Sequence, residues 1–383
     1  MASANEQPSK SPLQEGQVID GHRIVRKLGE GGMGVVYEGV HEQTGERVAI
    51  KLLHAEIAKH REVTLRFINE ARAVEIIRHP GLVRTVRTGQ LDGVPYLIME
   101  FLDGTSLSAY LREHGGRLPL IDTLDVVRQV ADALAASHDK GIVHRDLKPD
   151  NVMLLARKEP GDSRFIAKVF DFGIAKLPPE LMSTELTVLR TQSGQLLGTP
   201  NYMAPEQCMS GRPITDKVDV YALGTLMFRC LAGRTPFVTS ARGDAGLMHL
   251  CAQQIAEPPP PLRVIAPEMP ESVEALLART LAKEPAERPG MKQLSRELAT
   301  LLASREVRDS ARLSGDEMPT VSAPVGSTPS LRSVPSLPTT PSTWGNTARV
   351  APPGPRRRIL YVAASLFGLA WFVLWVLWAL GKI

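Results

Sequence analysis

Residues 144–151, which read HRDLKPDN, carry side chains that could do chemistry at close spacing. They place a carboxylate at Asp146, an ammonium at Lys148 and an amide at Asn151. In phosphoryl transfer, such a carboxylate accepts the proton of a substrate hydroxyl, the lysine lies near the transferred phosphate, and the amide holds Mg²⁺. A polar turn between a helix and a strand would also explain this run in isolation. Other motifs must therefore decide between the two interpretations.

A glycine-rich run and a strand that carries a lysine precede this segment. The run GEGGMGVV contains Gly29, Gly31 and Gly34. Taken alone, its spacing is equally typical of a hairpin turn. Because strand-like runs flank it on both sides, a flap whose backbone amides cover phosphates fits better than a dinucleotide-binding turn. Lys51 ends the run VAIK, and Glu70 on the following helix is the candidate acid to hold its ammonium over a triphosphate.

Two further motifs follow the segment HRDLKPDN. The run VFDFG places a second candidate metal carboxylate, Asp171, 20 residues beyond Asn151. Residues 198–206 read GTPNYMAPE. If Glu206 is buried, its charge requires a partner, and Arg288 is the candidate. We expect this pair to be structural, with no part in the chemistry.

The elements that must position these residues change in type along the chain. Short β-prone runs with glycine or charged turns between them predict five strands, at residues 22–28, 35–40, 47–52, 82–90 and 95–101. A three-to-four-residue apolar period predicts a helix at 63–78, and helices dominate after residue 104, most clearly at 121–139. The predicted fold is α+β and bilobal, with a small β-rich N-lobe at 21–102 that holds one helix, and a larger, mainly helical C-lobe at 103–304.

The two ends of the chain differ from the body. Residues 1–20 are predicted to be a disordered leader, since they lack the apolar core of a secretory signal. Residues 305–358 are rich in Pro, Ser and Thr, which predicts a disordered linker. The 22 residues 359–380 carry no charge, which predicts a transmembrane helix about 33 Å long. Three arginines, at 356–358, precede this segment and a single lysine, Lys382, follows it. Because the more positively charged side of a transmembrane helix faces the cytoplasm, the N-terminal part is predicted to lie there.

Composition argues against several classes of function. The chain has 45 Lys and Arg against 41 Asp and Glu, and no basic stripe interleaved with aromatic residues, so nucleic acid is not an expected partner. The three cysteines, Cys208, Cys230 and Cys251, are odd in number and form no CxxC pair. This pattern favours a reduced compartment over a disulfide framework or a zinc site.

Taken together, these motifs resemble those of bacterial eukaryotic-like (Hanks-type) serine/threonine protein kinases. The resemblance covers about residues 21–303, and the glycine loop, lysine strand, helix glutamate, HRDLKPDN, DFG and APE appear in order and properly spaced. It implies the bilobal protein-kinase fold, ATP and Mg²⁺ as cofactors with Mn²⁺ as the alternative ion, and phosphorylation of protein substrates. A lysine two places after the aspartate, here Lys148, is what Ser/Thr kinases carry, so the acceptor is expected to be Ser or Thr.

The resemblance also implies a role for each matching residue. Asp146 would be the catalytic base and Lys148 would steady the γ-phosphate. Asn151 and Asp171 would hold Mg²⁺, while Lys51 and its helix glutamate would grip the α- and β-phosphates.

The adenine ring would lie at the hinge between the lobes. Met99 matches the gatekeeper position, and backbone groups of Glu100 and Leu102 would bond to the adenine. The apolar side chains that would enclose the ring are Leu28, Val36, Ala49 and Met153.

Arg145 points to regulation by phosphorylation. A cation beside Asp146 is most easily held off the catalytic carboxylate by a phosphate supplied elsewhere. In the segment after the DFG motif, Thr191 and Ser193 align best with the autophosphorylation pair of the family. Because this segment is longer than the family pattern, Thr184 and Thr187 remain alternatives.

Two rival functions keep the same fold. A pseudokinase scaffold would bind partners without catalysis, but each role in phosphoryl transfer is filled, by Lys51, Asp146, Asn151 and Asp171. A small-molecule kinase is disfavoured because residues 198–206 resemble the peptide-docking part of protein kinases. The expected protein is a non-specific serine/threonine kinase in membrane-tethered signalling, single-pass in the inner membrane. Dimerisation through the N-lobe is expected only from the resemblance.

Overall fold

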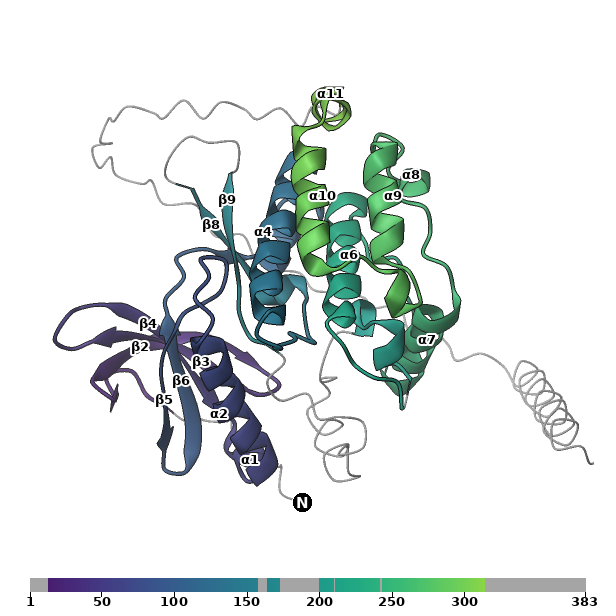
Figure 1. Cartoon of the computed structure of the whole chain (residues 1–383). Coiled ribbons are helices and arrows are strands. Elements are labelled where there is room, and N and C mark those ends of the chain that lie inside the picture. Colours follow the sequence, from purple (N-terminus) through teal and green to yellow (C-terminus); the bar gives the residue numbers. More distant parts are fainter. Residues whose placement is uncertain (1–12, 158–163, 173–199, 210, 242, 314–383) are drawn as a thin grey trace, which may run out of the picture. The chain divides into compact units, whose positions relative to one another are not determined.

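The structure, a computed structural model, describes residues 13–157, 164–172, 200–209, 211–241 and 243–313 (Figure 1). Strands dominate as far as Glu100 and helices dominate beyond it, so the predicted fold with a β-rich N-lobe and a helical C-lobe is confirmed. Within these ranges, no helix is both long enough and apolar enough to cross a bilayer. The predicted transmembrane segment, 359–380, lies outside them.

An antiparallel sheet in the order β1-β2-β3-β4-β6-β5 forms the N-lobe. Its strands are β1 (Val18–Ile19), β2 (His22–Gly31), β3 (Gly34–His41), β4 (Arg47–Leu53), β5 (Thr85–Leu91) and β6 (Val94–Glu100). Side chains alternate between the two faces of a strand. Val48, Ile50 and Leu52 therefore pack into one apolar cluster, while Ala49 and Lys51 lie on the opposite face. This alternation directs Lys51 toward the C-lobe.

The sheet begins earlier than predicted. Residues 13–20 were expected to belong to a disordered leader, but Leu13 is buried and β1 pairs with β2. Leu13 and Ile19 belong to the apolar cluster on the outer face of the sheet. That contact with distant strands orders the segment, and it is not visible in local composition.

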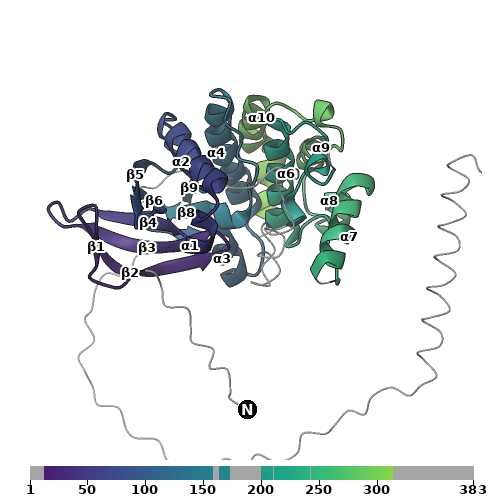
Figure 2. The same cartoon turned by 90° about the horizontal axis from the view of Figure 1, so that it is seen from below.

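One helix, α2 (Arg61–Glu75), lies along the sheet, preceded by the short α1 (Ala55–Ala58) (Figures 1 and 2). After α2 the chain reaches β5 only at Thr85, although a strand was predicted from residue 82. The preceding residues pair elsewhere, because the N–H of Val83 donates to the carbonyl of Val169 at 2.9 Å. This connection ties the N-lobe to a strand of the C-lobe.

The C-lobe is built around α4 (Leu120–His138) and α6 (Lys217–Ala232), which lie side by side (Figures 1 and 2). Nearly all of α6 is buried, as expected for a helix that is apolar on every side. The other helices are α3 (Leu107–Glu113), α7 (Gly243–Ala256), α8 (Leu262–Ile265), α9 (Glu271–Thr280) and α10 (Met291–Ala303). A small sheet in the order β7-β8-β9 consists of β7 (Thr105–Ser106), β8 (Val152–Ala156) and β9 (Phe165–Val169).

The helical part extends beyond residue 304, where the disordered linker was predicted to begin. Residues 305–313 form α11 (Arg305–Leu313), in which Val307 and Ala311 are buried. These two residues are one helical turn apart and face α4 and α10. The otherwise charged sequence of α11 hides this narrow apolar stripe.

A buried ion pair between Glu206 and Arg288 stabilises the C-lobe, as predicted from the sequence. The guanidinium donates two hydrogen bonds to the carboxylate, at 2.7 and 2.8 Å, and both side chains are at most 4% exposed. Glu206 lies in the 3-10 helix η4 (Pro205–Gln207), and Arg288 follows η5 (Pro285–Glu287). The remaining guanidinium N–H groups donate to the carbonyls of Ala282, Lys217 and Lys283. The charges are buried but fully hydrogen-bonded, which is what makes such a pair tolerable.

We predict that Arg288→Ala lowers the free energy of unfolding by about 3–5 kcal/mol, because it leaves the Glu206 carboxylate buried without its partner. Urea unfolding measures this change. The matched control is Arg279→Ala, which removes a half-exposed pair with Glu297 and should cost at most about 1 kcal/mol. Equal losses in the two variants would contradict the structural role of the buried pair.

Candidate active site

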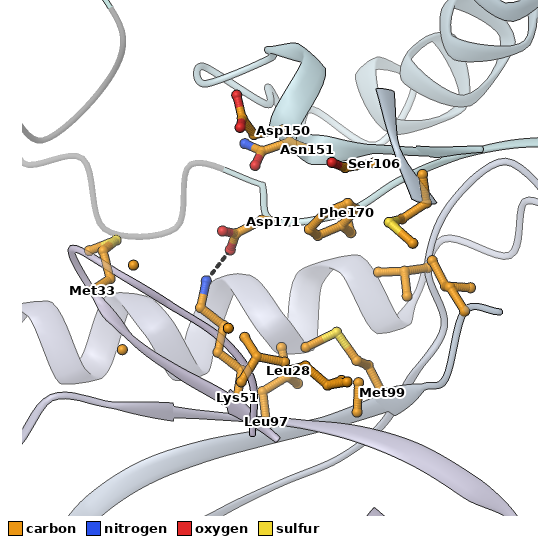
Figure 3. A pocket seen from close by; sticks show the side chains of 18 of the residues that line it. Leu28, Met33, Lys51, Leu97, Met99, Ser106, Asp150, Asn151, Phe170 and Asp171 are labelled. Carbon is orange, nitrogen blue, oxygen red and sulfur yellow. Dashed lines mark hydrogen bonds and ion pairs between the residues drawn. The ribbon is translucent and has the colours of Figure 1, made fainter. Parts of the chain in front are cut away.

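A cavity of about 940 Å³ lies between the N-lobe sheet and the small sheet of the C-lobe (Figure 3). One part of it is lined by residues predicted to enclose a ring or to mark the hinge, namely Leu28, Val36, Ala49, Met99, Glu100, Leu102 and Met153. Its polar part is lined by Gly29, Gly31, Gly34, Lys51, Asp146, Lys148, Asn151 and Asp171. An apolar slot that opens onto a cation and several carboxylates suits a flat ring joined to a polyanion.

The glycine-rich run forms the tip of the β2–β3 hairpin. Gly31 and Gly34 face each other across a two-residue turn, as expected from a run between two strands. A Cβ at Gly34 would overlap the carbonyl of Leu52, so this glycine is required for close strand packing. By contrast, Gly29 and Gly31 have no atoms within 4 Å of such a Cβ. Their backbone is therefore open to the cavity that they line.

Lys51 contacts the carboxylate of Asp171 (Figure 3). The lysine is 8% exposed on β4, while Asp171 follows β9 with a left-handed backbone at φ 57°. Its predicted partner Glu70 belongs to α2, and the Glu70 side chain lies outside the described part of the structure. The ion pair brings together Lys51, which was predicted to bind phosphate, and Asp171, which was predicted to bind the metal ion.

Four polar residues of the segment HRDLKPDN line the cavity, namely Asp146, Lys148, Asp150 and Asn151. Lys148 donates to the carboxylate of Asp146 at 3.0 Å. Asn151, which is 4% exposed, donates from its amide nitrogen to the Asp146 carbonyl at 2.9 Å. This bond leaves the amide oxygen of Asn151 as the atom that can accept. An amide oxygen and the Asp171 carboxylate are donors of the kind that Mg²⁺ prefers, so these residues fit a magnesium ion.

Asp219 on α6 fixes the start of the segment HRDLKPDN by hydrogen bonds to its backbone. Its carboxylate accepts hydrogen bonds from the backbone N–H groups of His144 and Arg145, both at 2.8 Å. His138 Nε2 lies 2.8 Å from the same carboxylate, which is fully buried on α6. Arg145 has a left-handed backbone at φ 63°, an unfavourable conformation for a side chain of its size. The charge-assisted bonds that these two N–H groups donate to Asp219 offset that cost.

His144 connects the two segments that carry the polar groups. It is fully buried, and burial lowers the pKa of its imidazole, so the ring is neutral at physiological pH. The neutral ring donates from Nε2 to the Phe170 carbonyl at 3.2 Å and accepts at Nδ1 from the Asp146 N–H at 3.3 Å. Its ring also lies 4.7 Å from that of Phe172. The position of Asp146 is thereby linked to the strand end that carries Asp171.

Sequence reasoning missed several residues of the site. Asp103, Ser106 and Asp150 also line the cavity, and only Asp150 belongs to a motif that singles it out. The run 219–224, DVYALG, stands out in the sequence, but its spacing assigned no role to Asp219, which lies 75 residues from His144.

Of the predicted regulatory residues, Arg145 belongs to the described part of the structure. The side chain of Arg145 is exposed and does not line the cavity. The predicted phosphorylation sites Thr191 and Ser193, with the alternatives Thr184 and Thr187, lie outside the described residues.

Comparison with known proteins agrees with this geometry. Residues 22–298 match the family described as "Protein kinase domain". The chain is 44% identical over 291 residues to serine/threonine-protein kinase Pkn1 of Myxococcus xanthus, a match that covers 76% of this chain and 39% of Pkn1. It is 36% identical over 272 residues to PknA of Mycobacterium tuberculosis, covering 70% of this chain and 58% of PknA. The chain thus spans about two to three fifths of these two relatives.

A solved structure is also similar. The crystal structure of the Mycobacterium tuberculosis PknI kinase domain matches with a TM-score of 0.57 and 26% sequence identity. The match covers 75% of this chain and 99% of that domain. The likeness extends over both lobes described here.

We predict that Asp219→Asn accelerates hydrogen exchange at the amides of His144 and Arg145 by about 10- to 100-fold, since bonds to a charged acceptor contribute about 1.5–3 kcal/mol. Exchange followed by mass spectrometry measures the effect. Asp216→Asn is the control, because the Asp216 carboxylate is 42% exposed and lies 3.9 Å from His138. Unchanged protection in Asp219→Asn would contradict the positioning role.

Proposed function

Because the chain belongs to the protein kinase domain family, we propose that it is a serine/threonine protein kinase that uses ATP to phosphorylate protein hydroxyls. The observation that carries the proposal is one cavity lined by five polar groups that phosphoryl transfer uses. These groups come from both lobes and are Lys51, Asp146, Lys148, Asn151 and Asp171.

The adenine would occupy the apolar part of the cavity. The N–H of Glu100 is already engaged with the Arg84 carbonyl at 3.0 Å, so the Glu100 carbonyl is the group that would accept from the adenine amino group. The Leu102 carbonyl accepts from Gly104 at 3.1 Å, so the Leu102 N–H is the group available for a ring nitrogen. These two backbone groups supply one acceptor and one donor at the hinge.

The phosphates would lie between the hairpin tip and the polar wall. Lys51 would exchange its contact with Asp171 for the α- and β-phosphates. Asn151 and Asp171 would then hold Mg²⁺, with Mn²⁺ as the alternative ion. When bound, the ion neutralises charge on the phosphate oxygens.

Asp146 would accept the proton of the substrate hydroxyl. Lys148, 3.0 Å from its carboxylate, would contact the transferred phosphoryl group and compensate its charge. Asp146 would thereby bind and orient the acceptor. Its own N–H donates to His144, and the N–H of the preceding Arg145 donates to Asp219.

We extend the proposal to autophosphorylation of Thr191 and Ser193. Its support is the exposed guanidinium of Arg145, directly before Asp146, where a phosphorylated segment could pair with it. A homodimer through the N-lobe stays a prediction from the family resemblance.

We predict that Asp146→Asn lowers phosphate transfer by about 10²- to 10⁴-fold, the usual contribution of a general base. The assay measures transfer from labelled ATP with Mg²⁺ to a protein substrate and to the chain itself, followed by phosphoamino-acid analysis. Asp92→Asn, in the exposed β5–β6 turn, should retain full activity. Equal label on the wild-type protein and Asp146→Asn would refute the enzymatic proposal, and label on tyrosine would refute the acceptor class.

We also propose that residues 359–380 anchor the protein in the inner membrane, with the kinase domain in the cytoplasm. The support is the charge-free run of 22 residues and the three arginines before it. The anchor would confine phosphorylation to proteins near that membrane and would place the enzyme in membrane-tethered signalling.

We predict that the full-length chain stays in the membrane pellet after alkaline carbonate extraction, because the apolar helix is stable only within the bilayer. A variant that lacks residues 359–380 should appear in the supernatant. As a control, replacement of these residues by an unrelated transmembrane helix should restore sedimentation. Release of the full-length chain by carbonate would rule out the anchor.

A further inference from the structure

The peptide group between Arg145 and Asp146 is held by side chains at both of its polar atoms. The carbonyl of Arg145 accepts a hydrogen bond from Nε2 of Gln207 at 3.0 Å. The N–H of Asp146 donates to Nδ1 of His144 at 3.3 Å. Because a peptide group is planar, a side chain that fixes its carbonyl also fixes the direction of its N–H. Gln207 therefore helps to set the plane from which Asp146 projects.

The backbone of Arg145 makes this support important. It is left-handed, at φ 63°, which is unfavourable for a residue with a large side chain. Asp219 accepts the N–H of Arg145 and so fixes the peptide group before it. That contact does not restrain the peptide group after Arg145, which rotates about the Cα–C bond of this residue. Of the two side-chain bonds that do restrain it, the bond from Gln207 is the shorter.

A second hydrogen bond orients the amide of Gln207. Its Oε1 accepts from the backbone N–H of Ala204 at 2.9 Å. With the oxygen turned toward Ala204, the nitrogen is the atom that faces the Arg145 carbonyl. A carboxylate in the same place would keep the bond from Ala204 and lose the bond to Arg145, because it has no N–H to donate. A single substitution can therefore separate the two bonds.

The backbone that carries Gln207 is fixed by contacts outside the catalytic segment. The residue before it, Glu206, is held by the buried ion pair with Arg288. Both residues belong to the segment 200–208, in which the Asn201 carbonyl accepts a hydrogen bond from α7 at 3.0 Å. The bond from Gln207 thus attaches the catalytic segment to a firmly held part of the C-lobe.

We propose that Gln207 is a positioning residue for phosphate transfer, which holds the peptide group between Arg145 and Asp146 so that the Asp146 carboxylate faces the acceptor hydroxyl. The effect on transfer rests on the proposed kinase function, while the effect on the peptide group does not. Gln207 itself does not line the cavity, so it acts on transfer through Asp146 and not by binding the nucleotide.

The first experiment tests the peptide group. Hydrogen exchange of the full-length chain is followed by mass spectrometry with fragmentation to single amides. In Gln207→Glu, we expect the amide of Asp146 to exchange about 2- to 10-fold faster than in the wild-type protein, the effect of losing one hydrogen bond. The amides of His144 and Arg145, which donate to Asp219, should keep their protection. Unchanged exchange at Asp146 would overturn the proposal.

The second experiment measures transfer from labelled ATP to a protein substrate, as kcat and as KM for ATP. We expect kcat to fall about 2- to 10-fold in Gln207→Glu and in Gln207→Met, an uncharged variant of similar length, with KM for ATP unchanged. The matched control is Gln43→Glu, the same substitution at an exposed position between β3 and β4. This control should behave as the wild-type protein.

The two variants separate positioning from a purely structural role. Because Gln207→Glu keeps the bond from Ala204, a side chain that only stabilises η4 would lose activity in Gln207→Met alone. Wild-type kcat in either variant would therefore overturn the proposal, as would a rise in KM for ATP at unchanged kcat. Inactivity of the wild-type protein would overturn the kinase function and the kinetic part that rests on it, while hydrogen exchange at Asp146 still decides whether Gln207 holds the peptide group.

Discussion

The buried carboxylate of Asp219 is the contact on which the arrangement of the candidate site depends. It accepts hydrogen bonds from the backbone N–H groups of His144 and Arg145. Arg145 is the one residue of the catalytic segment, 144–151, whose backbone is left-handed. Such a backbone costs roughly 1–3 kcal/mol, which bonds to a fully charged acceptor can offset. Because Asp146 comes next in the chain, its direction is set by α6 rather than by the loop itself. A flexible-looking segment is thus held by a rigid helix.

The two walls of the cavity are aligned by contacts that cross between segments. On the N-lobe side, the alternation of β4 turns Lys51 inward, and its ammonium meets Asp171. On the C-lobe side, the neutral ring of His144 bonds to the carbonyl of Phe170, directly before Asp171. A shift of either segment therefore disturbs the other. Burial keeps His144 uncharged, which is why it can serve as both donor and acceptor in this link.

The segment that ends in Cys208 is attached at several points to the lobe around it. Glu206 anchors it through a buried ion pair, and Gln207 ties it to the catalytic segment. Its other side rests on α7 through Asn201. A segment held this firmly has little freedom to absorb a local change.

The sequence by itself determined what local spacing controls. The period-two alternation of β4 placed Lys51 on the cavity side, the motifs named the residues of the polar wall, and the need of a buried Glu206 for a cation predicted its partner. The ends of the domain were misjudged at Leu13 and Val307, because single apolar residues are ordered by distant elements. Only the tertiary structure brought Asp219 to the backbone of the catalytic segment, and Lys51 to Asp171, 120 residues away. Such contacts form when helices and strands pack, and no periodicity or spacing along the chain records them.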